Sequence, residues 1–573
     1  MTRSFAPSSE PSLKHRAHHL LVPFFAIAAL VLAGCAWQGP NTDSFKAYLA
    51  QQSKSLPRSE KKAIKRFLAD ESLTPEQQNV VQHQLGRYSV AKYGDEAMAT
   101  LEQWVAIPTY RQDGVPQHEN PEFKKMAAAI QAKAEAFGLA FRNIDDRVYE
   151  ITLPGATDEL IGVHAHADVV PVNPANWVLD NGTKLDPFKV TKIGNKMYGR
   201  GTEDDKNGIV VTLYGMRVIL EENLPLQRTF KLLVDTTEET SGGAIAYYFE
   251  RNPTPEYNLA MDGGYPVVIA EKGYGVVMTE FPVRSGRGLG LEFVGLTGGL
   301  ASNQIPKVAT ALVNSPDLDN SAAMLRGAAQ QFVLEHGGNF SIDVTEQNEQ
   351  LLITVTGVSA HSSDPASGVN PVARLLLFID LINQRGGAQQ NHITAAAHYA
   401  AQNWGLNFYA EKLGVDFSHP FMGPLTSAIT LVNLNHERLQ LAVNLRVPEG
   451  KPTAQLKQEI EQKLQDWKRS TRVNFDLDIT IAEPMYRNPK GAWVNALLDV
   501  ASTNLGLPRE FAASSGATSV HNLPNGVQFG LSMPGVKYTG HNANEFKTVD
   551  QFLLDFQVVT EMLVKVGQLP ELN

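Results

Sequence analysis

The sequence predicts an α/β fold that is interrupted by an inserted α+β segment. Two observations lead to this prediction. From about residue 96 to residue 280, apolar runs of strand length alternate with runs that have helical spacing. Such alternation predicts a mainly parallel sheet with helices on both faces. After residue 280 the strand-like runs interleave apolar and polar residues, which is typical of sheets with one covered face.

The apolar spacing places individual elements along this fold. In the first part we expect helices at 97–105, 122–137, 205–220 and 243–249, with buried strands at 160–163 and 229–234. The insertion has predicted strands at 351–355 and 439–447 and predicted helices at 371–382 and 454–467. The chain rejoins the first part near residue 485, with covering helices at 496–504 and 549–564. We therefore expect a signal segment at 1–34, a helical spacer at 35–95, a catalytic domain at 96–280 and 485–573, and a lid domain at 281–484.

Composition narrows the class of protein. A chain of 573 residues is too long for one compact core. Hydrophobic residues make up 43% and charged residues 19%, which fits a globular enzyme. The net charge of -10 argues against a nucleic-acid partner, which would require a basic surface.

The N-terminus has the pattern of a secretory signal. Basic residues precede a short apolar stretch that ends in Leu32-Ala33-Gly34-Cys35. This ending resembles the lipobox of bacterial lipoproteins, in which the cysteine is lipidated and becomes the new N-terminus. We expect an envelope protein anchored through Cys35 on the periplasmic side. The alternative is an uncleaved membrane anchor with an incidental cysteine.

Paired acids follow a buried strand at Glu238 and Glu239. An unpaired buried charge is costly, but at a metal site one carboxylate can ligate a cation while its neighbour handles protons. Similar clusters follow other apolar runs: His166 and Asp168, Asp204 and Asp205, Asp262, and residues 541–545. Asp168 is the candidate partner that holds the ring of His166, and His164 is a competing histidine on the same strand. Alone, a histidine of this kind is more often a satisfied core residue.

In chain order these motifs resemble a dinuclear zinc peptidase family. That family includes glutamate carboxypeptidase, acetylornithine deacetylase, aminoacylase and the bacterial Xaa-His or PepV-type dipeptidases. The resemblance covers about residues 96–570 and rests on His166-x-Asp168, Gly201-x-x-Asp204-x-Lys206, Glu238-Glu239, Asp262 and His541. It implies a three-layer α/β catalytic domain that carries an inserted lid.

The resemblance also implies roles for the residues. His166 and Asp262 would bind one Zn²⁺, Glu239 and His541 would bind the other, and Asp204 would bridge both. Mn²⁺ or Co²⁺ are alternative ions. Glu238 would be the general base and Asp168 the partner of His166. The peptide bond between Asp204 and Asp205 is expected to be cis.

Four residues of the second half resemble the family's substrate contacts. His361, within Val358-Ser359-Ala360-His361, would stabilise the oxyanion. Asn303 and Arg446 resemble substrate-binding residues of the dipeptidase branch, and Arg446 would bind a free carboxylate. The alternative for Arg446 is a surface ion pair. Gly516 falls in the family's glycine-rich substrate loop, which has fewer glycines here because Ala517 follows Gly516.

We therefore expect hydrolysis of small peptides, with dipeptides as the first choice. An N-acyl-amino-acid deacylase or a metallocarboxypeptidase would use the same chemistry, and an inactive binding lipoprotein is the alternative from another class. The sequence leaves open whether the protein is a monomer or a dimer.

Overall fold

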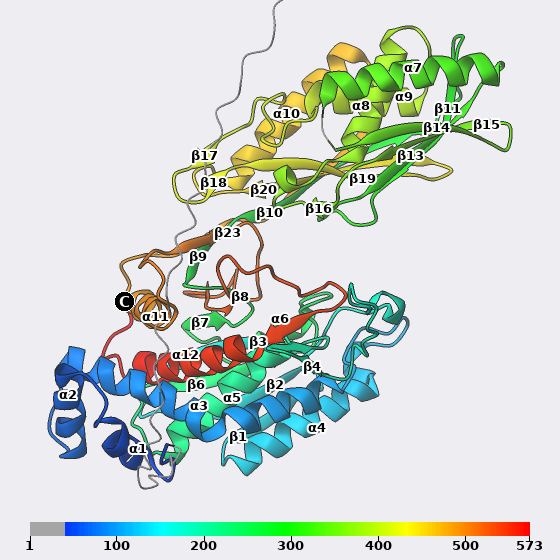
Figure 1. Ribbon diagram of the computed structural model, residues 1–573. Coiled ribbons are helices and arrows are strands. Elements are labelled where there is room, and N and C mark those ends of the chain that lie inside the picture. Colours follow the sequence, from blue (N-terminus) through cyan, green and yellow to red (C-terminus); the bar gives the residue numbers. More distant parts are fainter. Residues whose placement is uncertain (1–39, 338) are drawn as a thin grey trace, which may run out of the picture.

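A nine-stranded sheet forms the centre of the first domain in the computed structural model, which describes residues 40–337 and 339–573 (Figure 1). Its central strands pair in parallel, as does one further pair toward one edge, and the remaining pairs are antiparallel, so the sheet is mixed and not mainly parallel as predicted. Across the sheet the strands are β1 (Ala140–Ile144), β2 (Val148–Leu153), β6 (Thr229–Asp235), β3 (Leu160–His166), β7 (Tyr257–Ala260), β24 (Val527–Gln528), β9 (Val268–Glu271) and β22 (Met485–Tyr486), and β23 (Ala512–Ser514) also pairs with β9.

Helices cover both faces of this sheet. Val148 and Leu233 pack in a small cluster with α6 (Gly243–Phe249), whereas their neighbours Tyr149 and Leu232 belong to the main core. Alternate residues of a strand face opposite sides, so the two clusters lie on opposite faces and the domain has three layers. The other helices of this domain's core are α3 (Pro75–Val105), α4 (Pro121–Ala136), α5 (Lys206–Glu221), α11 (Ala492–Leu505) and α12 (Val549–Gly567).

Residues 40–95 are part of this core, which corrects the predicted spacer. The predicted boundary at residue 95 falls inside α3, whose buried side runs without interruption from Val81 to Val105. The preceding helices α1 (Phe45–Gln52) and α2 (Arg58–Leu68) pack against it. The ring of Phe45 lies 5.5 Å from that of Tyr88, between ring centroids. The segment is therefore bound by apolar packing to the catalytic layer.

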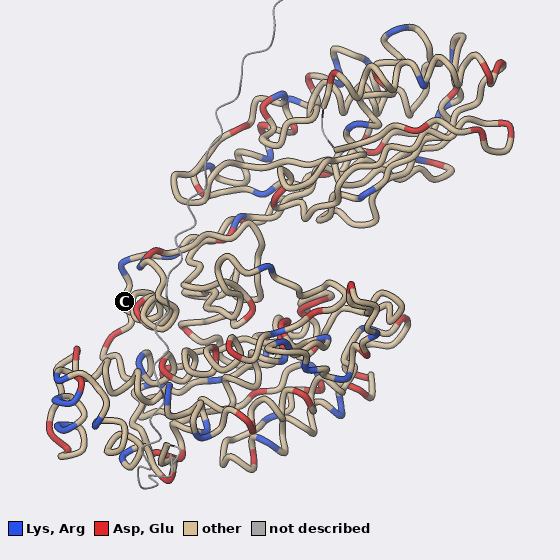
Figure 2. The backbone as a smooth tube through the Cα atoms, in the orientation of Figure 1, with Lys and Arg blue, Asp and Glu red and all other residues tan. Residues whose placement is uncertain are grey.

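An eight-stranded antiparallel sheet forms the second domain. Its strands alternate buried and less buried residues, as expected when one face is covered. Their order is β14 (Ser341–Gln347), β15 (Gln350–Thr356), β13 (Val308–Asn314), β11 (Glu292–Gly298), β19 (Thr426–Leu434), β20 (Arg438–Val447), β10 (Gly273–Pro282) and β21 (Asp476–Ile481). Figure 1 shows the helices of this domain on one side of the sheet: α7 (Leu318–His336), α8 (Pro371–Gln384), α9 (His392–Asn403) and α10 (Thr453–Thr471). Lysine, arginine, aspartate and glutamate are interspersed along both domains (Figure 2).

The chain crosses between the domains at Lys272. Strand β9 of the first sheet ends at Glu271, and β10 of the second sheet begins at Gly273. The return lies between Ile481 and Met485. The predicted start of the insertion, residue 281, lies inside β10, so the chain enters the second sheet earlier than predicted.

No helix among residues 40–337 and 339–573 is long and apolar enough to cross a membrane. The predicted signal segment 1–34 and Cys35 lie outside the described residues.

Gly86→Ala tests the close contact between α3 and α12. A Cβ at this position would lie 2.6 Å from the backbone oxygen of Gln557, which cannot yield as a flexible side chain can. Overpacking of this kind costs about 1–3 kcal/mol and should outweigh the gain in helix propensity of about 1 kcal/mol. We expect a lower midpoint in chemical denaturation.

Gly327→Ala is the matched control, because a Cβ on this helical glycine meets nothing within 4 Å. It should leave stability unchanged or raise it slightly. A Gly86→Ala variant as stable as wild type would show that the two helices are not so close.

Candidate metal centre

Three neighbouring strands deliver the acidic and histidine residues to one edge of the first sheet. His166 is the last residue of β3 and is level with Asp235, the last residue of β6. Glu238 and Glu239 follow β6 within four residues, and Asp262 follows β7 within two. These strands are parallel, so their carboxyl ends meet at the same edge. The sheet therefore brings together residues that are nearly one hundred positions apart in the chain.

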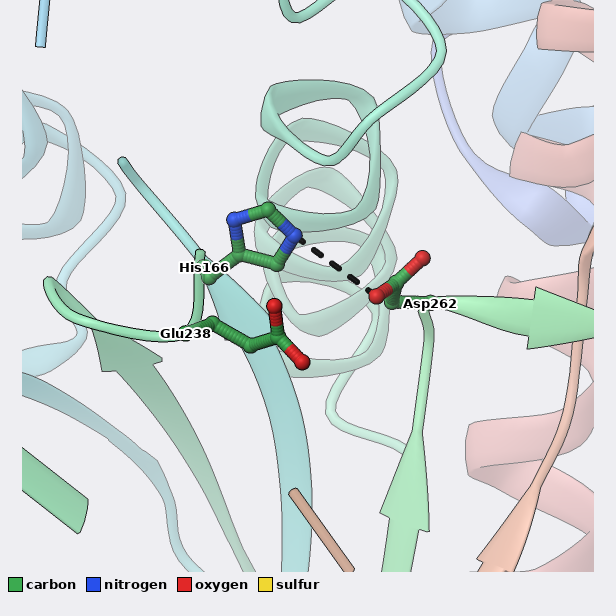
Figure 3. A group of neighbouring side chains, drawn as sticks. All are labelled: His166, Glu238 and Asp262. Atoms are coloured by element: carbon green, nitrogen blue, oxygen red, sulfur yellow. Dashed lines mark ion pairs between the residues drawn. The ribbon is translucent and has the colours of Figure 1, made fainter. Parts of the chain in front are cut away.

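His166, Glu238 and Asp262 form the first candidate group. Their nitrogen and oxygen atoms lie within 4.8 Å of one another, and Figure 3 shows the three side chains around a common centre. The distance between His166 Nε2 and Asp262 Oδ2 is 3.7 Å. The predicted ligands of one cation are therefore close together, with the predicted base beside them.

Asp204 lies between this group and a second one. Its Oδ1 is 2.9 Å from His166 Nε2, and its Oδ2 is 3.0 Å from His541 Nε2. His541 Nε2 is also 2.9 Å from Glu239 Oε1. The two oxygens of one carboxylate thus face two histidines, which is the arrangement expected of a bridging ligand. The peptide bond from Asp204 to Asp205 is cis, as predicted.

The chemistry of these atoms fits divalent cations. His166 Nε2 and Asp204 Oδ1 are buried and make no hydrogen bond, although such groups normally have a partner. Four carboxylates converge with only two imidazoles, and nitrogen and carboxylate ligands of this kind suit Zn²⁺ and related ions. The site therefore fits the metal-binding role that the sequence suggested.

The same crowding shifts the titration of the side chains. Burial raises the pKa of Glu238 well above its ordinary value, and the charges of Asp262, Glu239 and Asp204 add to this. Partial desolvation lowers the pKa of His541, but hydrogen bonds to Asp204 and Glu239 outweigh it and raise the pKa to about 11. Bound cations would take the place of these protons and oppose both shifts.

Asp168 orients both sides of the site. Its backbone carbonyl is 2.9 Å from His166 Nδ1, and its carboxylate Oδ1 is 3.5 Å away. The same carboxylate accepts hydrogen bonds from the backbone N–H groups of Glu238 and Glu239, at 3.2 and 3.0 Å. The predicted partner of His166 therefore also fixes the turn that carries the base, which the sequence did not reveal.

Glu545 holds the loop of Asp204, the predicted bridging residue. This fully buried carboxylate accepts hydrogen bonds from the backbone N–H groups of Gly201, Glu203 and Asp204, and from Arg200. Arg200 also donates to the carbonyl of Asn542, next to His541, at 3.0 Å. The Arg200–Glu545 pair thus connects the loops of Asp204 and His541. In the sequence, Glu545 could have been noticed as an acid four residues after His541, a predicted ligand.

Two motif residues point away from the centre. Burial lowers the pKa of Lys206 to about 7, and its Nζ donates to the carbonyls of Trp104 and Ile107 at the end of α3. Burial also lowers the pKa of His164 to about 4, and its Nε2 pairs with Asn258 at 3.0 Å. His164 is therefore a core histidine that pairs with Asn258 and not with the acidic cluster, although its Nδ1 makes no hydrogen bond among the described residues. This resolves the ambiguity with His166.

The predicted substrate residues meet where the second domain approaches the first. Strand β12 (Gln304–Ile305) pairs with β16 (Ala360–His361), and the backbone N–H of Ser362 donates to the carbonyl of Asn303 at 2.9 Å. The guanidinium of Arg446 is 3.5 Å from Ser362 Oγ and donates to the carbonyl of Ser515 at 3.1 Å. Ser515 precedes Gly516. His361, Asn303, Arg446 and Gly516 are thus linked through direct neighbours.

Arg446 is buried rather than part of a surface ion pair. It is 4% exposed and has no carboxylate within 4.0 Å among the described residues. Burial lowers its pKa from the ordinary value. A buried cation without a counter-ion is unfavourable, so this position favours a bound anion.

Glu271 fixes the loop around Gly516. This fully buried carboxylate accepts hydrogen bonds from Thr518 Oγ1 at 2.8 Å and Gln528 Nε2 at 2.6 Å, and faces His521 Nδ1 at 2.6 Å. The other ring nitrogen of His521 faces the carbonyl of Glu483 at 2.7 Å. Both partners are acceptors, so His521 is cationic, and its pKa is raised by these contacts despite burial. Sequence reasoning missed this network, because its members are distributed over more than 250 positions.

Comparisons with known proteins agree with this geometry. Residues 162–565 match the model of peptidase family M20/M25/M40, which is most of the chain.

The chain belongs to this family. It is 28% identical over 492 residues to a Beta-Ala-Xaa dipeptidase of Lactobacillus delbrueckii subsp. lactis, covering 83% of this chain and 97% of that protein. Its fold is similar to that of human carnosine dipeptidase 1, with a TM-score of 0.50, 13% identity and coverage of 85% and 99% of the two chains. The di-peptidase Dug1p of Saccharomyces cerevisiae gives the same TM-score and coverage at 11% identity.

His541→Ala should reduce the bound metal toward one equivalent. The substitution removes the imidazole whose Nε2 faces Asp204 Oδ2 and Glu239 Oε1, while the group around His166 stays intact. Metal analysis of the purified, dialysed variant measures this. His361→Ala is the control, because His361 is outside both ligand groups and should keep the full metal content. Two full equivalents in His541→Ala would contradict the assignment.

Proposed function

We propose that this chain is a dizinc dipeptidase that hydrolyses the peptide bond of small peptides with a free C-terminal carboxylate. The observation that carries the proposal is Asp204, whose two oxygens face His166 and His541 with Glu238 alongside. Family membership and the similarity to a protein named as a dipeptidase support the same reaction. The buried guanidinium of Arg446 supports a substrate that ends in a carboxylate.

Two ions held by the ligand groups of His166, Asp204, Glu239, Asp262 and His541 would polarise the scissile carbonyl and make a water molecule acidic at neutral pH. Glu238 then takes the proton from the attacking water on its carboxylate and returns it to the nitrogen of the leaving amine. Among the described residues no hydrogen bond holds the Glu238 side chain, and Asp168 holds only its backbone N–H. Proton transfer by such a group contributes about 10²–10⁴-fold to the rate.

His361 presents a hydrogen-bond donor for the oxyanion. The backbone N–H of Ser363 donates to His361 Nδ1 at 3.3 Å, so this nitrogen is the acceptor and the proton is on Nε2. Burial and the positive charge of Arg446 lower the pKa of His361 from its ordinary value, which favours the neutral ring. Nε2 has no hydrogen-bond partner among the described residues, and its N–H can therefore reach the carbonyl oxygen as charge develops there.

Glu238→Gln should abolish turnover while both metals stay bound. Glutamine keeps the size and the polar contacts of the side chain but cannot accept the proton, so kcat should fall by about 10²–10⁴-fold or more. Dipeptide hydrolysis and metal content are measured together. Glu250→Gln, an exposed acid at the end of α6, is the control and should match wild type. Near wild-type kcat in Glu238→Gln would rule out this base.

Assays of the wild-type protein against free dipeptides, N-acetyl amino acids and longer peptides separate the related activities. A dipeptidase should prefer the first group by a wide margin. A preference for N-acetyl amino acids would favour the deacylase alternative instead.

We also propose that the mature protein is anchored by lipid at Cys35 on the periplasmic side of a bacterial envelope. The support is the basic start and the Leu32-Ala33-Gly34-Cys35 ending. Cys35→Ser should release or mislocalise the protein without changing the activity of the purified enzyme, because the site begins far downstream at His166. Membrane fractionation checks this, and normal anchoring of the variant would contradict the proposal.

A further inference from the structure

Lys272 occupies the single position between β9 of the first sheet and β10 of the second. Its backbone N–H donates to the carbonyl of Ser514 at 3.0 Å, in the strand that leads to the Gly516 loop. Its Nζ donates to the carbonyl of Pro424 at 2.5 Å, in the hairpin of β17 (Ser418–His419) and β18 (Gly423–Pro424) of the second domain. The residue is 4% exposed. Lys272 thus places a buried amine between the domains.

Lys272 and Arg446 are close together and carry the same charge. Tyr274, two residues after Lys272, is paired directly with Arg446 across β10 and β20. Burial lowers the pKa of Lys272, and the charge of Arg446 lowers it further. Like charges repel strongly in an environment with little water. Neither cation has a carboxylate within 4.0 Å among the described residues.

The acids near this pair are occupied elsewhere. Glu271, the neighbour of Lys272, accepts from Thr518 and Gln528 and pairs with His521. Lys272 itself makes one hydrogen bond through Nζ, to a neutral carbonyl, and an ammonium group has three N–H donors. Two buried cations without a counter-ion form an arrangement that a bound anion would stabilise.

We infer that the substrate's carboxylate binds in a pocket beside Arg446, the carboxylate pocket, and that Lys272 is the second cation of this pocket. Together with Arg446 it determines the requirement for a substrate with a free C-terminal carboxylate. This inference rests on the proposed peptidase function. The fork of Arg446 fixes the direction of the carboxylate, and Lys272 adds positive charge from the connection between the domains. Lys272 is a specificity-determining residue and takes no part in bond cleavage.

A purely structural role would give a different result. Lys272 could act only as a strut that holds Pro424, as Lys468 of α10 holds the carbonyl of Phe475 in the same domain at 2.5 Å. Removal of such a strut would weaken all substrates alike and lower stability. Removal of a charge that binds the carboxylate would weaken the binding only of substrates with a free carboxylate.

The experiment compares a free dipeptide with its C-terminal amide in metal-loaded wild type, Lys272→Met, Lys272→Gln and Lys272→Arg. For Met and Gln we expect KM for the free dipeptide to rise about tenfold or more, with kcat largely kept and little change for the amide. Lys272→Arg should recover much of the selectivity. Arg446→Ala is the reference and should show the same acid-specific loss. Lys468→Met, which loses a similar lysine–carbonyl bond far from the pocket, should leave both substrates unchanged.

Several outcomes would overturn the inference. Equal weakening of acid and amide in Lys272→Met and Lys272→Gln, with the acid-specific loss kept in Arg446→Ala, would make Lys272 a strut. Wild-type behaviour of Lys272→Gln would show that the charge is not used. Failure of the proposed function is distinct from both, because the wild-type protein would then hydrolyse neither the dipeptide nor its amide.

Discussion

The convergence of carboxylates at one edge of the parallel strands is the constraint on which the site depends. Asp204, Glu238, Glu239 and Asp262 are brought together with two imidazoles and no lysine or arginine among them. Such a group is strongly repulsive unless cations neutralise it. Surrounding hydrogen bonds hold the loops in spite of this repulsion. Asp168 fixes the turn of the two glutamates, and the Arg200–Glu545 pair fixes the loops of Asp204 and His541.

The second domain presents the opposite charge. Arg446 and Lys272 are buried without carboxylate partners among the described residues, and His361 is kept neutral beside them. The proposed substrate, a peptide with a free carboxylate, would therefore meet cationic groups of the second domain and the connection, and the acidic centre of the first domain. In the proposed binding mode a short peptide would lie between two regions of opposite charge, beside the connection at Lys272.

The loop around Gly516 belongs to the first domain but supports the second. Glu271 accepts a hydrogen bond from Thr518 of this loop and faces His521, and the carbonyl of Ser515 accepts a hydrogen bond from Arg446. The two neighbouring residues Glu271 and Lys272 therefore serve different sides of the connection, one through the loop and one through the hairpin at Pro424.

The sequence by itself determined the local elements and the identity of the chemistry. Helix α6 begins and ends where its apolar spacing predicts, and β6 and β20 are within a residue of their predicted bounds, because these patterns depend on neighbours along the chain. Paired acids after a buried strand pointed to a metal site, because an unpaired buried charge is costly, and the resemblance to a known family supplied the set of predicted ligands. The tertiary structure alone decided which histidine faces the site, since His164 and His166 differ only in their partners Asn258 and Asp204. It also decided that residues 40–95 join the core, that β10 belongs to the second sheet, and that Lys272 lies beside Arg446. These features depend on contacts between distant segments, which no local pattern records.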